Sequence, residues 1–365
     1  MSFAIPDFCL VLLFGAPAAS FGPDEVIAPD AALLDARLKQ RELTVIDATA
    51  LVKDERARLI AAAKRRHADT VAIAFAGHGQ DFGYLQREGV RAVHKLNSPA
   101  EIAVARVPLS CDRRTEAGPF DIVGDIHGCA DELEALLGKL GYGVDWSGSK
   151  AERRCTVAAP AGRRAIFVGD LVDRGPRTPD VLRIVMGMTG MGQALAVPGN
   201  HDAKFGRWLD GRDVRLTNGL AASAEQMATE PRDFHQMAGA FLRSLPSHLW
   251  LDGGRLAVAH AGIRQDMIGR SAGGVREFCL YGEATGETDE YGLPVRLDRA
   301  ANYCGETAVI YGHTVVRNAA WLNNTICIDT GCCFGGGLTA LRWPERDLVS
   351  VPAVRTYVES KRPFG

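Results

Sequence analysis

The sequence lacks the features that define several large classes of protein. None of its apolar runs approaches the roughly 20 residues that a membrane-spanning helix needs. Its nine cysteines, scattered from Cys9 to Cys333, are an odd number without a CxxC pair, which fits neither a disulfide framework nor a zinc knuckle. A formal net charge of −2 gives no global basic field for nucleic acid. We therefore expect reduced cysteines, no membrane contact, and nucleic-acid contacts that are local.

The N-terminal segment also lacks the positive charge of a secretory signal. Residues 1–8, MSFAIPDF, contain an aspartate and no Lys or Arg, whereas export signals carry Lys or Arg before their apolar run. APAAS at 16–20 imitates a cleavage site, so export stays open as an alternative. We expect a cytoplasmic protein, and we interpret the apolar run that starts at Cys9 as a buried strand.

What is present is an alternation of short apolar runs and helical patterns. The chain has 365 residues, 47% of them apolar, which is enough for two domains. Three early runs are typical of buried strands: 11–15, 43–49 and 70–77. An amphipathic helix is predicted over 53–67, so this part has the pattern of a parallel α/β sheet. The polar stretch 109–119 is interpreted as a linker, and we predict domains at 1–115 and 116–365.

Five later apolar runs share one feature at their ends. Each passes through a small residue or glycine to a side chain that can bind a metal: Asp125, Asp170, Asn200, His260 and His313. Ligands of α/β sheets gather beyond the carboxyl ends of strands, so we expect these side chains at one edge of a sheet. Glycine also ends strands for purely structural reasons, which explains any one of the runs but explains all five poorly.

The motifs at these positions carry a specific resemblance. They read GDIHG (124–128), GDLVDRG (169–175), GNHD (199–202), AHAG (259–262) and YGH (311–313). In this order they resemble the binuclear metallophosphoesterases, in the branch of the phosphoprotein phosphatases and diadenosine tetraphosphate hydrolases. The resemblance implies an α/β fold, a calcineurin-like β-sandwich flanked by helices.

The resemblance also implies a pair of divalent metal ions, with Mn²⁺ expected and Ni²⁺, Co²⁺ or Fe left open. The implied ligands of the first metal are Asp125, His127 and Asp170. Those of the second are Asp170, Asn200, His260 and His313, with Asp170 bridging. Two dications bring four positive charges and the two carboxylates return two, so the centre would attract phosphate and acidify a bridging water. The expected reaction is in-line attack of a metal-bridging hydroxide on phosphorus.

Four further residues receive roles by the same resemblance. Arg174 would clamp phosphate oxygens, since a guanidinium matches two oxygens at once. His201 would protonate the leaving group, and Asp173 would orient His201, unless Asp173 is a solvated loop residue. Asp329, after another apolar run, is expected close to the ligands. The other histidines are expected to be ordinary surface or core residues: His67, His78, His94, His235 and His248.

Longer stretches resemble a narrower family. GNHDAKF and the segments 211–223, 251–296 and 324–353 are similar to the phosphatase module of bacterial polynucleotide kinase-phosphatases, which heal RNA ends. The similarity covers 116–360 and implies substrates with 3′-phosphate or 2′,3′-cyclic phosphate RNA ends, or related nucleotides. Because nothing after residue 365 is available for a ligase domain, we expect a separate ligase as a possible partner.

The same family begins with a P-loop kinase, and the first domain here lacks the essential parts of one. The strand is followed by GAPAASFG, in which there is no GK[ST], and no Lys or Arg occurs before Arg37. A P-loop needs its lysine and its Ser/Thr, and Pro17 also removes a backbone donor. Asp30 stands near the position of the family's activating aspartate. We predict a truncated, degenerate P-loop-kinase-like domain without kinase activity, with residual kinase activity as the alternative.

The leading hypothesis is therefore a metal-dependent phosphoesterase that hydrolyses phosphomonoesters or 2′,3′-cyclic phosphates. A serine/threonine phosphoprotein phosphatase and a dinucleoside polyphosphate hydrolase are the alternatives with the same metal centre. Asp202 in GNHD disfavours the phosphoprotein phosphatase, since those enzymes usually carry glutamate there. A non-catalytic scaffold is a third hypothesis, and the intact set of ligands argues against it.

Overall fold

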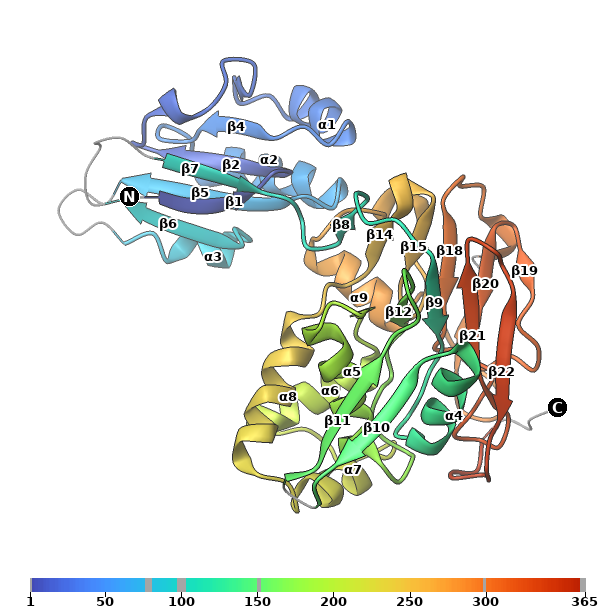
Figure 1. Cartoon of the computed structure of the whole chain (residues 1–365). Helices are drawn as coiled ribbons and strands as arrows, with labels where there is room; N and C mark the ends of the chain where they lie inside the picture. The colour runs from blue at the N-terminus through green and yellow to red at the C-terminus, as the bar shows by residue number, and fades with distance from the viewer. Residues whose placement is uncertain (1, 76–80, 97–102, 150–151, 298–299, 362–365) are drawn as a thin grey trace. The chain divides into compact units, whose positions relative to one another are not determined.

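The computed structural model describes residues 2–75, 81–96, 103–149, 152–297 and 300–361. The chain divides into two compact units (Figure 1). Unit 1 comprises Met1–Asp112 and Gly269–Val275, and unit 2 comprises Arg113–Ile268 and Arg276–Gly365. The predicted division after residue 115 did not anticipate that the late segment Gly269–Val275 would belong to unit 1. None of the helices in the described ranges is both long and apolar enough to cross a bilayer.

Unit 1 is built around a parallel sheet, as its apolar runs predict. The strands follow the order β3 (Val26–Ile27), β4 (Thr44–Asp47), β2 (Cys9–Phe14), β5 (Asp69–Phe75) and β6 (Ala92–Leu96). The connecting helices are α1 (Ala31–Lys39), α2 (Lys53–Arg65) and α3 (Tyr84–Glu88). A separate parallel pair joins β1 (Ser2–Pro6) to β7 (Ala103–Val107).

The central strand β2 is buried on both faces. Leu10 and Leu12 lie in a core that includes Leu34 of α1, whereas Val11 and Leu13 lie in a second core on the other side of the sheet. Side chains alternate between the faces of a strand, so a continuous apolar run is what a sheet covered on both faces requires. The opening apolar run is therefore a central strand with a core on each of its faces.

The loop after β2 does not have the architecture of a phosphate-binding loop. Gly15 has a φ of 63°, and its N–H donates to the Thr49 hydroxyl at 2.8 Å. A three-residue 3-10 turn, η1 (Ala18–Ser20), follows, and the next α-helix along the chain begins only at Ala31. Asp30 is the N-cap of that helix, where its carboxylate accepts two backbone N–H groups and its pKa is lowered by them.

The late segment Gly269–Val275 is held in unit 1 mainly by Arg270. The Arg270 side chain is buried, and its guanidinium lies 5.0 Å from the centre of the Phe8 ring. Three backbone carbonyls accept hydrogen bonds from it: those of Leu38 (3.1 Å), Arg66 (2.6 Å) and Lys39 (3.3 Å). These bonds satisfy carbonyl groups near the ends of α1 and α2 that have no partner inside their own helices.

Unit 2 is a sandwich of two sheets. The first has the order β13 (Ala194–Ala196), β12 (Arg164–Phe167), β9 (Phe120–Val123), β21 (Gly337–Trp343) and β22 (Leu348–Pro352). The second has the order β19 (Trp321–Leu322), β20 (Thr325–Cys327), β18 (Ala308–Tyr311), β15 (Leu256–Val258), β14 (Leu249–Leu251) and β8 (Asp112–Arg113).

Two cores stabilise this sandwich. Between the sheets, Ile122 and Ile166 of the first sheet share one buried cluster with Val258 and Ile310 of the second. On the other face of the first sheet, Phe167 belongs to a cluster formed with the helices. These helices are α4 (Ala130–Leu140), α5 (Thr178–Gly190), α6 (Asn200–Leu209), α7 (Leu220–Met227) and α8 (Arg232–Ser244).

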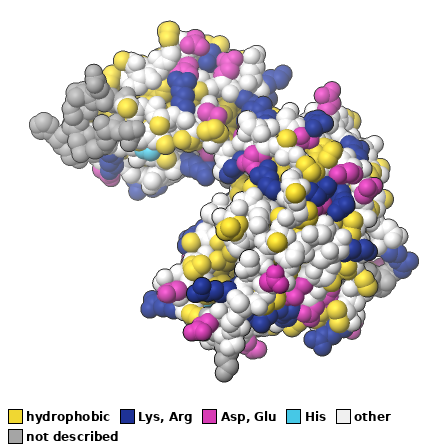
Figure 2. All heavy atoms as spheres, viewed as in Figure 1, with side chains coloured by type: hydrophobic (Ala, Val, Ile, Leu, Met, Phe, Trp, Pro, Cys, Tyr) yellow, Lys and Arg dark blue, Asp and Glu magenta, His cyan; other side chains and the backbone are white. Residues whose placement is uncertain are grey.

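The remaining elements of unit 2 are two separate strand pairs, part of a helix and three short turns. Two antiparallel hairpins pair β10 (Gly143–Ser147) with β11 (Arg154–Ala158) and β16 (Ala284–Thr288) with β17 (Pro294–Arg296). Helix α9 (Gly273–Tyr281) begins in the late segment of unit 1 and ends in unit 2, and the short turns η4 (Asp252–Gly254), η5 (Gln265–Met267) and η6 (Ala300–Asn302) complete unit 2. On the face shown in Figure 2, Lys and Arg side chains are interspersed with Asp and Glu, as the small net charge predicts.

Candidate metal and active centre

The predicted ligands converge, but they come from two sheets and not from one sheet edge. Asp125, Asp170 and Asn200 follow β9, β12 and β13, which are parallel neighbours in the first sheet. His260 and His313 follow β15 and β18, which are parallel neighbours in the second sheet. The expectation of a single edge was wrong because the apolar runs do not reveal which strands pair. The carboxyl ends of both parallel sets meet at one end of the sandwich.

Tight backbone turns place these ligands, and the motif glycines permit the turns. His127, Asp170 and His313 have φ values of 49°, 47° and 67°, in the left-handed region that non-glycine residues rarely adopt. A Cβ on Gly312 would lie 1.9 Å from Asp125 Oδ1, and one on Gly199 would lie 2.0 Å from Asp170 Oδ1. Only glycine leaves room for the carboxylates at these two positions.

Asp170 occupies the middle of the ligand group. Its Oδ2 lies 3.4 Å from His127 Nε2, and its Oδ1 lies 3.4 Å from His260 Nε2. His127 Nδ1 lies 3.0 Å from the Val172 carbonyl, which can only accept, so Nδ1 carries the proton and Nε2 presents its lone pair. The two oxygens of one carboxylate therefore face two different sets of nitrogen ligands, as a bridging ligand requires.

The second set of ligands is compact. His260 Nε2 lies 3.0 Å from His313 Nδ1 and 3.1 Å from Asn200 Oδ1. Asp125 Oδ2 accepts the backbone N–H of His313 at 3.0 Å and lies 4.0 Å from His260 Nδ1. Asp125 therefore contacts the residues expected at the second metal, and its assignment to the first metal stays a prediction.

The chemistry of these residues fits divalent cations. Asp125 Oδ1 and His313 Nε2 are buried polar atoms without a hydrogen-bond partner in the described part of the chain. Burial lowers the pKa of His127 and of His313 well below the usual value and also lowers that of His260, so neutral imidazoles with available lone pairs are favoured. Carboxylate oxygen, amide oxygen and neutral imidazole are suitable ligands for Mn²⁺ and similar ions.

Two buried carboxyl groups respond in opposite directions to this environment. Burial, followed by repulsion from Asp329 and Asp170, raises the pKa of Asp125 well above its usual value. Burial alone would raise the pKa of Asp170 as well, but the neighbouring imidazoles, His260 foremost, lower it below its usual value. Positive charge placed between these residues would stabilise both carboxylates.

Arg174 and His201 lie beside the ligands. The Arg174 guanidinium nitrogens lie 3.1 Å from His127 Nε2 and 3.2 Å from His201 Nε2. His201 Nδ1 lies 2.7 Å from Asp173 Oδ2, and Asp173 has no exposed surface. The alternative of a solvated loop aspartate is therefore wrong. Because Nδ1 donates to that carboxylate, His201 presents Nε2 to the space beside Arg174.

Asp329 lies on the loop that supports Arg174. Its Oδ1 accepts the Gly331 N–H at 3.0 Å, and burial raises the pKa of its carboxyl to about 6. The same loop brings Cys333 Sγ to 3.7 Å from Arg174 Nη1 and the Phe334 ring centre to 4.8 Å from the guanidinium carbon. Asp329 thus lies near the ligands, as expected, while the neighbours that contact Arg174 were not predicted.

Sequence reasoning missed one structural residue of the centre. Asp202 is fully buried, and its carboxylate accepts the N–H groups of Leu171 (2.9 Å) and Gly199 (2.8 Å). It thereby ties the turn after β12 to the start of α6, next to two ligands. The signal was present in GNHD, where Asp202 was weighed only as a distinction between families.

The histidines outside the motifs lie elsewhere. His94 stacks on Phe3 at 4.6 Å between ring centres, His235 Nε2 bonds to the Met227 carbonyl, and His248 is fully buried. His67 follows α2 with a φ of 52°. His78 lies outside the described residues.

A cleft of about 510 Å³ adjoins the ligands, two of which, Asn200 and His313, line it. Its lining includes Arg174 and His201, together with two arginines that the motifs did not indicate, Arg296 and Arg317. Lys361 adds a further positive charge. These basic residues outnumber the one acidic residue of the lining, Glu359, and a mainly positive cleft suits a polyanionic substrate.

Comparison with known proteins identifies the family. Residues 118–317 match the calcineurin-like phosphoesterase model. The chain belongs to this family. The predictions of a calcineurin-like fold and of a phosphoesterase enzyme are thus confirmed, and divalent metal use follows from the family and the ligand set. The chain is 45% identical over 250 residues to the asymmetrical bis(5′-nucleosyl)-tetraphosphatase PrpE of Anoxybacillus flavithermus, covering 67% of this chain and 99% of that protein. The protein of the same name from Bacillus subtilis is 42% identical to this chain over 246 residues. That match covers 66% of this chain and 98% of the Bacillus subtilis protein.

Proposed function

We propose that this phosphoesterase hydrolyses dinucleoside tetraphosphates asymmetrically, to a nucleoside triphosphate and a nucleoside monophosphate. The observation that carries the proposal is the 45% identity that extends over 99% of a relative with that name. The cationic lining of the cleft supports it, because a four-phosphate chain brings several negative charges to the centre. This reading takes precedence over RNA-end healing, the leading hypothesis from the motifs.

The ligands have distinct parts in the proposed reaction. Asp170 would bridge two divalent cations, with His127 on one side and His260, His313 and Asn200 on the other. Cations bound there would neutralise phosphate charge and lower the pKa of a water that they share. His127 keeps its proton at Nδ1 through the Val172 carbonyl, which orients Nε2 toward the centre.

Arg174 and His201 would act on the phosphate and the leaving group. The Arg174 guanidinium, positioned by Cys333 and Phe334, can donate two parallel hydrogen bonds to phosphate oxygens. His201 would hold a proton at Nε2 for the leaving oxygen, while Asp173 fixes the ring through Nδ1. Both side chains line the cleft, so a bound phosphate can reach them.

A second candidate is hydrolysis of 3′-phosphate or 2′,3′-cyclic phosphate RNA ends. It is favoured by the stretches at 211–223 and 251–296, which resemble the phosphatase module of polynucleotide kinase-phosphatases. In that case a separate ligase would be needed to join the healed ends. Such a substrate would carry fewer negative charges around the scissile phosphate than a tetraphosphate chain does.

We further propose that unit 1 does not transfer phosphate. The loop after β2 lacks the lysine and Ser/Thr of a P-loop, and no α-helix starts at its end. Asp30, near the position of the family's activating aspartate, is the N-cap of α1 and accepts two backbone N–H groups through Oδ1. Calorimetry with ATP tests this proposal directly, and micromolar affinity would contradict it.

The substrate is tested with Mn²⁺-reconstituted protein and three compounds: diadenosine tetraphosphate, 2′,3′-cyclic AMP and a phosphoserine peptide. We expect the highest kcat/KM for diadenosine tetraphosphate, with AMP and ATP as products separated by anion-exchange chromatography. Asp170→Asn is the control that should abolish turnover of all three compounds. Preference for the cyclic nucleotide would favour the RNA-end function, and preference for the peptide would refute both nucleotide functions.

A further inference from the structure

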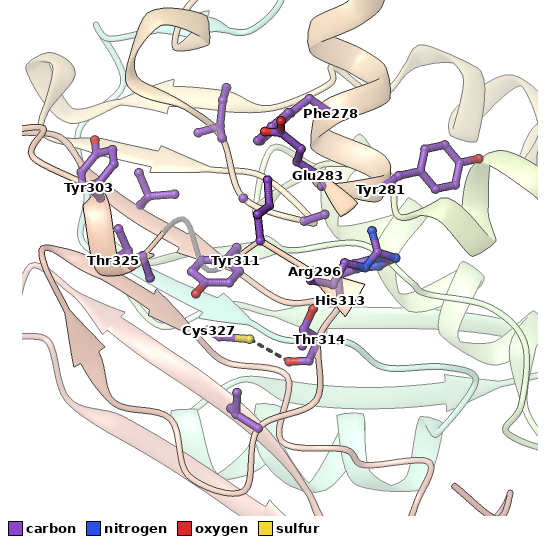
Figure 3. A pocket seen from close by; sticks show the side chains of 18 of the residues that line it. Phe278, Tyr281, Glu283, Arg296, Tyr303, Tyr311, His313, Thr314, Thr325 and Cys327 are labelled. Atoms are coloured by element: carbon purple, nitrogen blue, oxygen red, sulfur yellow. Dashed lines mark hydrogen bonds between the residues drawn. The ribbon is translucent and has the colours of Figure 1, made fainter. Parts of the chain in front are cut away.

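A second pocket of about 400 Å³ lies beside the metal and active centre (Figure 3). Aromatic side chains provide much of its lining: Phe278 and Tyr281 of α9, together with Tyr303 and Tyr311. In the view of Figure 3, Tyr303 lies toward one end of the pocket and Tyr281 toward the other, with Tyr311 between them. The volume falls within the range of pockets that bind small organic molecules.

We propose that this pocket binds the nucleoside of the monophosphate half of the substrate. The inference rests on the proposed function, since it names where one half of a dinucleoside tetraphosphate lies. A base would stack on the aromatic side chains, and its 5′-phosphate would reach the metal centre.

The position of the pocket carries the first part of the argument. Arg296, His313 and Thr314 line both this pocket and the catalytic cleft, so the two spaces share a wall. His313 is one of the expected metal ligands, and its Nδ1 lies 3.0 Å from His260 Nε2. A molecule that fills the pocket is therefore in contact with a residue of the centre, and a phosphate attached to it need not extend far.

The chemistry of the lining carries the second part. Besides the aromatic rings, the pocket presents aliphatic side chains such as Ile263, Val295 and Val309. Its polar groups are largely engaged within the protein: the Tyr303 hydroxyl donates to the Thr307 carbonyl at 2.7 Å, and the Cys327 thiol donates to the Thr314 carbonyl at 3.1 Å. An apolar, aromatic surface beside a phosphate site matches a base joined to a phosphate, because every base has a π-face that can stack.

Charge divides the substrate between the two spaces. Arg296 and Glu283 are the charged residues that line the pocket, whereas the cleft is lined by Arg174, Arg296, Arg317 and Lys361 and by one acidic residue, Glu359. The polyphosphate chain is therefore favoured in the cleft, and the neutral nucleoside is favoured in the pocket.

The test separates recognition of the base from recognition of phosphate. Calorimetry measures Kd for AMP and for inorganic phosphate with the Mn²⁺-loaded full chain. Tyr281→Ala removes a ring that is 39% exposed, and Tyr303→Ala removes the half-buried ring. We expect each change to raise the Kd of AMP about tenfold and to leave the Kd of phosphate within twofold.

Two matched variants control for folding and for the hydroxyl group. Tyr303→Phe keeps the ring and should bind AMP within twofold of the original protein, provided that stacking is the cause. Tyr291→Ala removes an exposed tyrosine outside both linings and should change neither Kd. Thermal unfolding of each variant verifies that the fold is retained.

Each outcome decides the inference. Equal affinity for AMP and phosphate in the original protein would overturn it, as would equal weakening of both ligands in the alanine variants. Should diadenosine tetraphosphate not be hydrolysed while AMP binding still depends on Tyr281 and Tyr303, the proposed function fails and the nucleoside pocket stands. If diadenosine tetraphosphate is hydrolysed but AMP binds no more tightly than phosphate, the proposed function stands and the nucleoside pocket fails.

Discussion

Replacement of His201 by alanine tests whether this histidine acts as the acid or binds a metal. The geometry allows both, because His127, Asp170 and His201 offer ligand atoms within 4.8 Å of one another. The hydrogen bond of 2.7 Å to the fully buried Asp173 favours the acid, since it leaves Nε2 directed at the cleft beside Arg174. For His201→Ala we therefore expect two metal ions per chain, as in the original protein.

The expected loss of activity depends on the leaving group. A positioned general acid contributes roughly 10²–10⁴-fold to rate, or about 3–5 kcal/mol of transition-state stabilisation. We expect His201→Ala to lower kcat about 10³-fold with phenyl phosphate, whose leaving group needs a proton. The loss should be about tenfold or less with p-nitrophenyl phosphate, whose leaving group is stable as an anion. Asp173→Asn should show the same dependence with a smaller loss, because it disturbs only the orientation of the ring.

The assay is steady-state hydrolysis of both esters together with elemental analysis of the dialysed protein. Loss of one metal equivalent in His201→Ala, or an equal loss of kcat with both esters, would refute the assignment as acid. Asp173→Asn separates the two roles further: within the described residues the Asp173 side chain bonds to His201 and makes no hydrogen bond to His127 or Asp170, so this change should leave the metal content intact.

Three further predictions concern stability and the packing of the centre. Arg270→Ala should destabilise the protein by about 1–3 kcal/mol, measured by urea unfolding, because the Lys39 and Arg66 carbonyls lose this donor while the Leu38 carbonyl keeps the Arg41 N–H. Arg264→Ala, at a more exposed arginine, should cost under about 1 kcal/mol. Gly312→Ala should abolish binding of at least one metal and lower kcat more than about 10²-fold, since the added methyl group collides with the Asp125 carboxylate. The control Gly138→Ala, in open space on helix α4, should raise the free energy of unfolding by about 0.5–1 kcal/mol. Asp329→Asn should stabilise the metal-free protein at pH 7 by on the order of 2–3 kcal/mol and should have little effect at pH 4. The folded pKa of Asp329, about 6, lies above the ordinary 3.8, so the protein with aspartate loses stability as pH rises through this interval. If the variant shifts the melting temperature equally at both pH values, this reasoning is contradicted.

The motifs predicted the centre well because its residues are framed by glycine. Gly199 and Gly312 stand next to the ligands Asn200 and His313 in the sequence, which makes the motifs recognisable, although the carboxylates about 2 Å from where their Cβ atoms would lie belong to Asp170 and Asp125 in other motifs. Asp170 and His313 follow buried strands, and the apolar runs before them are visible without a structure. Local constraints of this kind need no knowledge of which strands pair.

What the sequence did not reveal depends on contacts between distant parts of the chain. The ligands come from two sheets because β15 and β18 pair with each other and not with β9 or β12, and no pattern in the strands encodes that choice. Arg270 belongs to unit 1 through carbonyls more than 200 positions earlier. Its own neighbourhood in the sequence resembles an ordinary surface turn.

The choice of substrate also depends on residues that the motifs do not reveal. The metal ligands, Arg174 and His201 act on any phosphoester, so the motifs that contain them cannot distinguish an RNA end from a dinucleotide. We expect discrimination to come from the lining around them, where Arg296 and Arg317 line the cleft and Tyr311 lines the adjoining pocket. Arg296 on β17 and Arg317 after β18 lie outside the shared motifs, whereas Tyr311 is the first residue of YGH (311–313). Two phosphoesterases with identical centres can therefore differ in substrate through a few residues of the lining, so the shared motifs leave the substrate open: the longer stretches resemble enzymes that act on RNA ends, whereas the 45% identity over 99% of a relative supports the proposal of dinucleoside tetraphosphates.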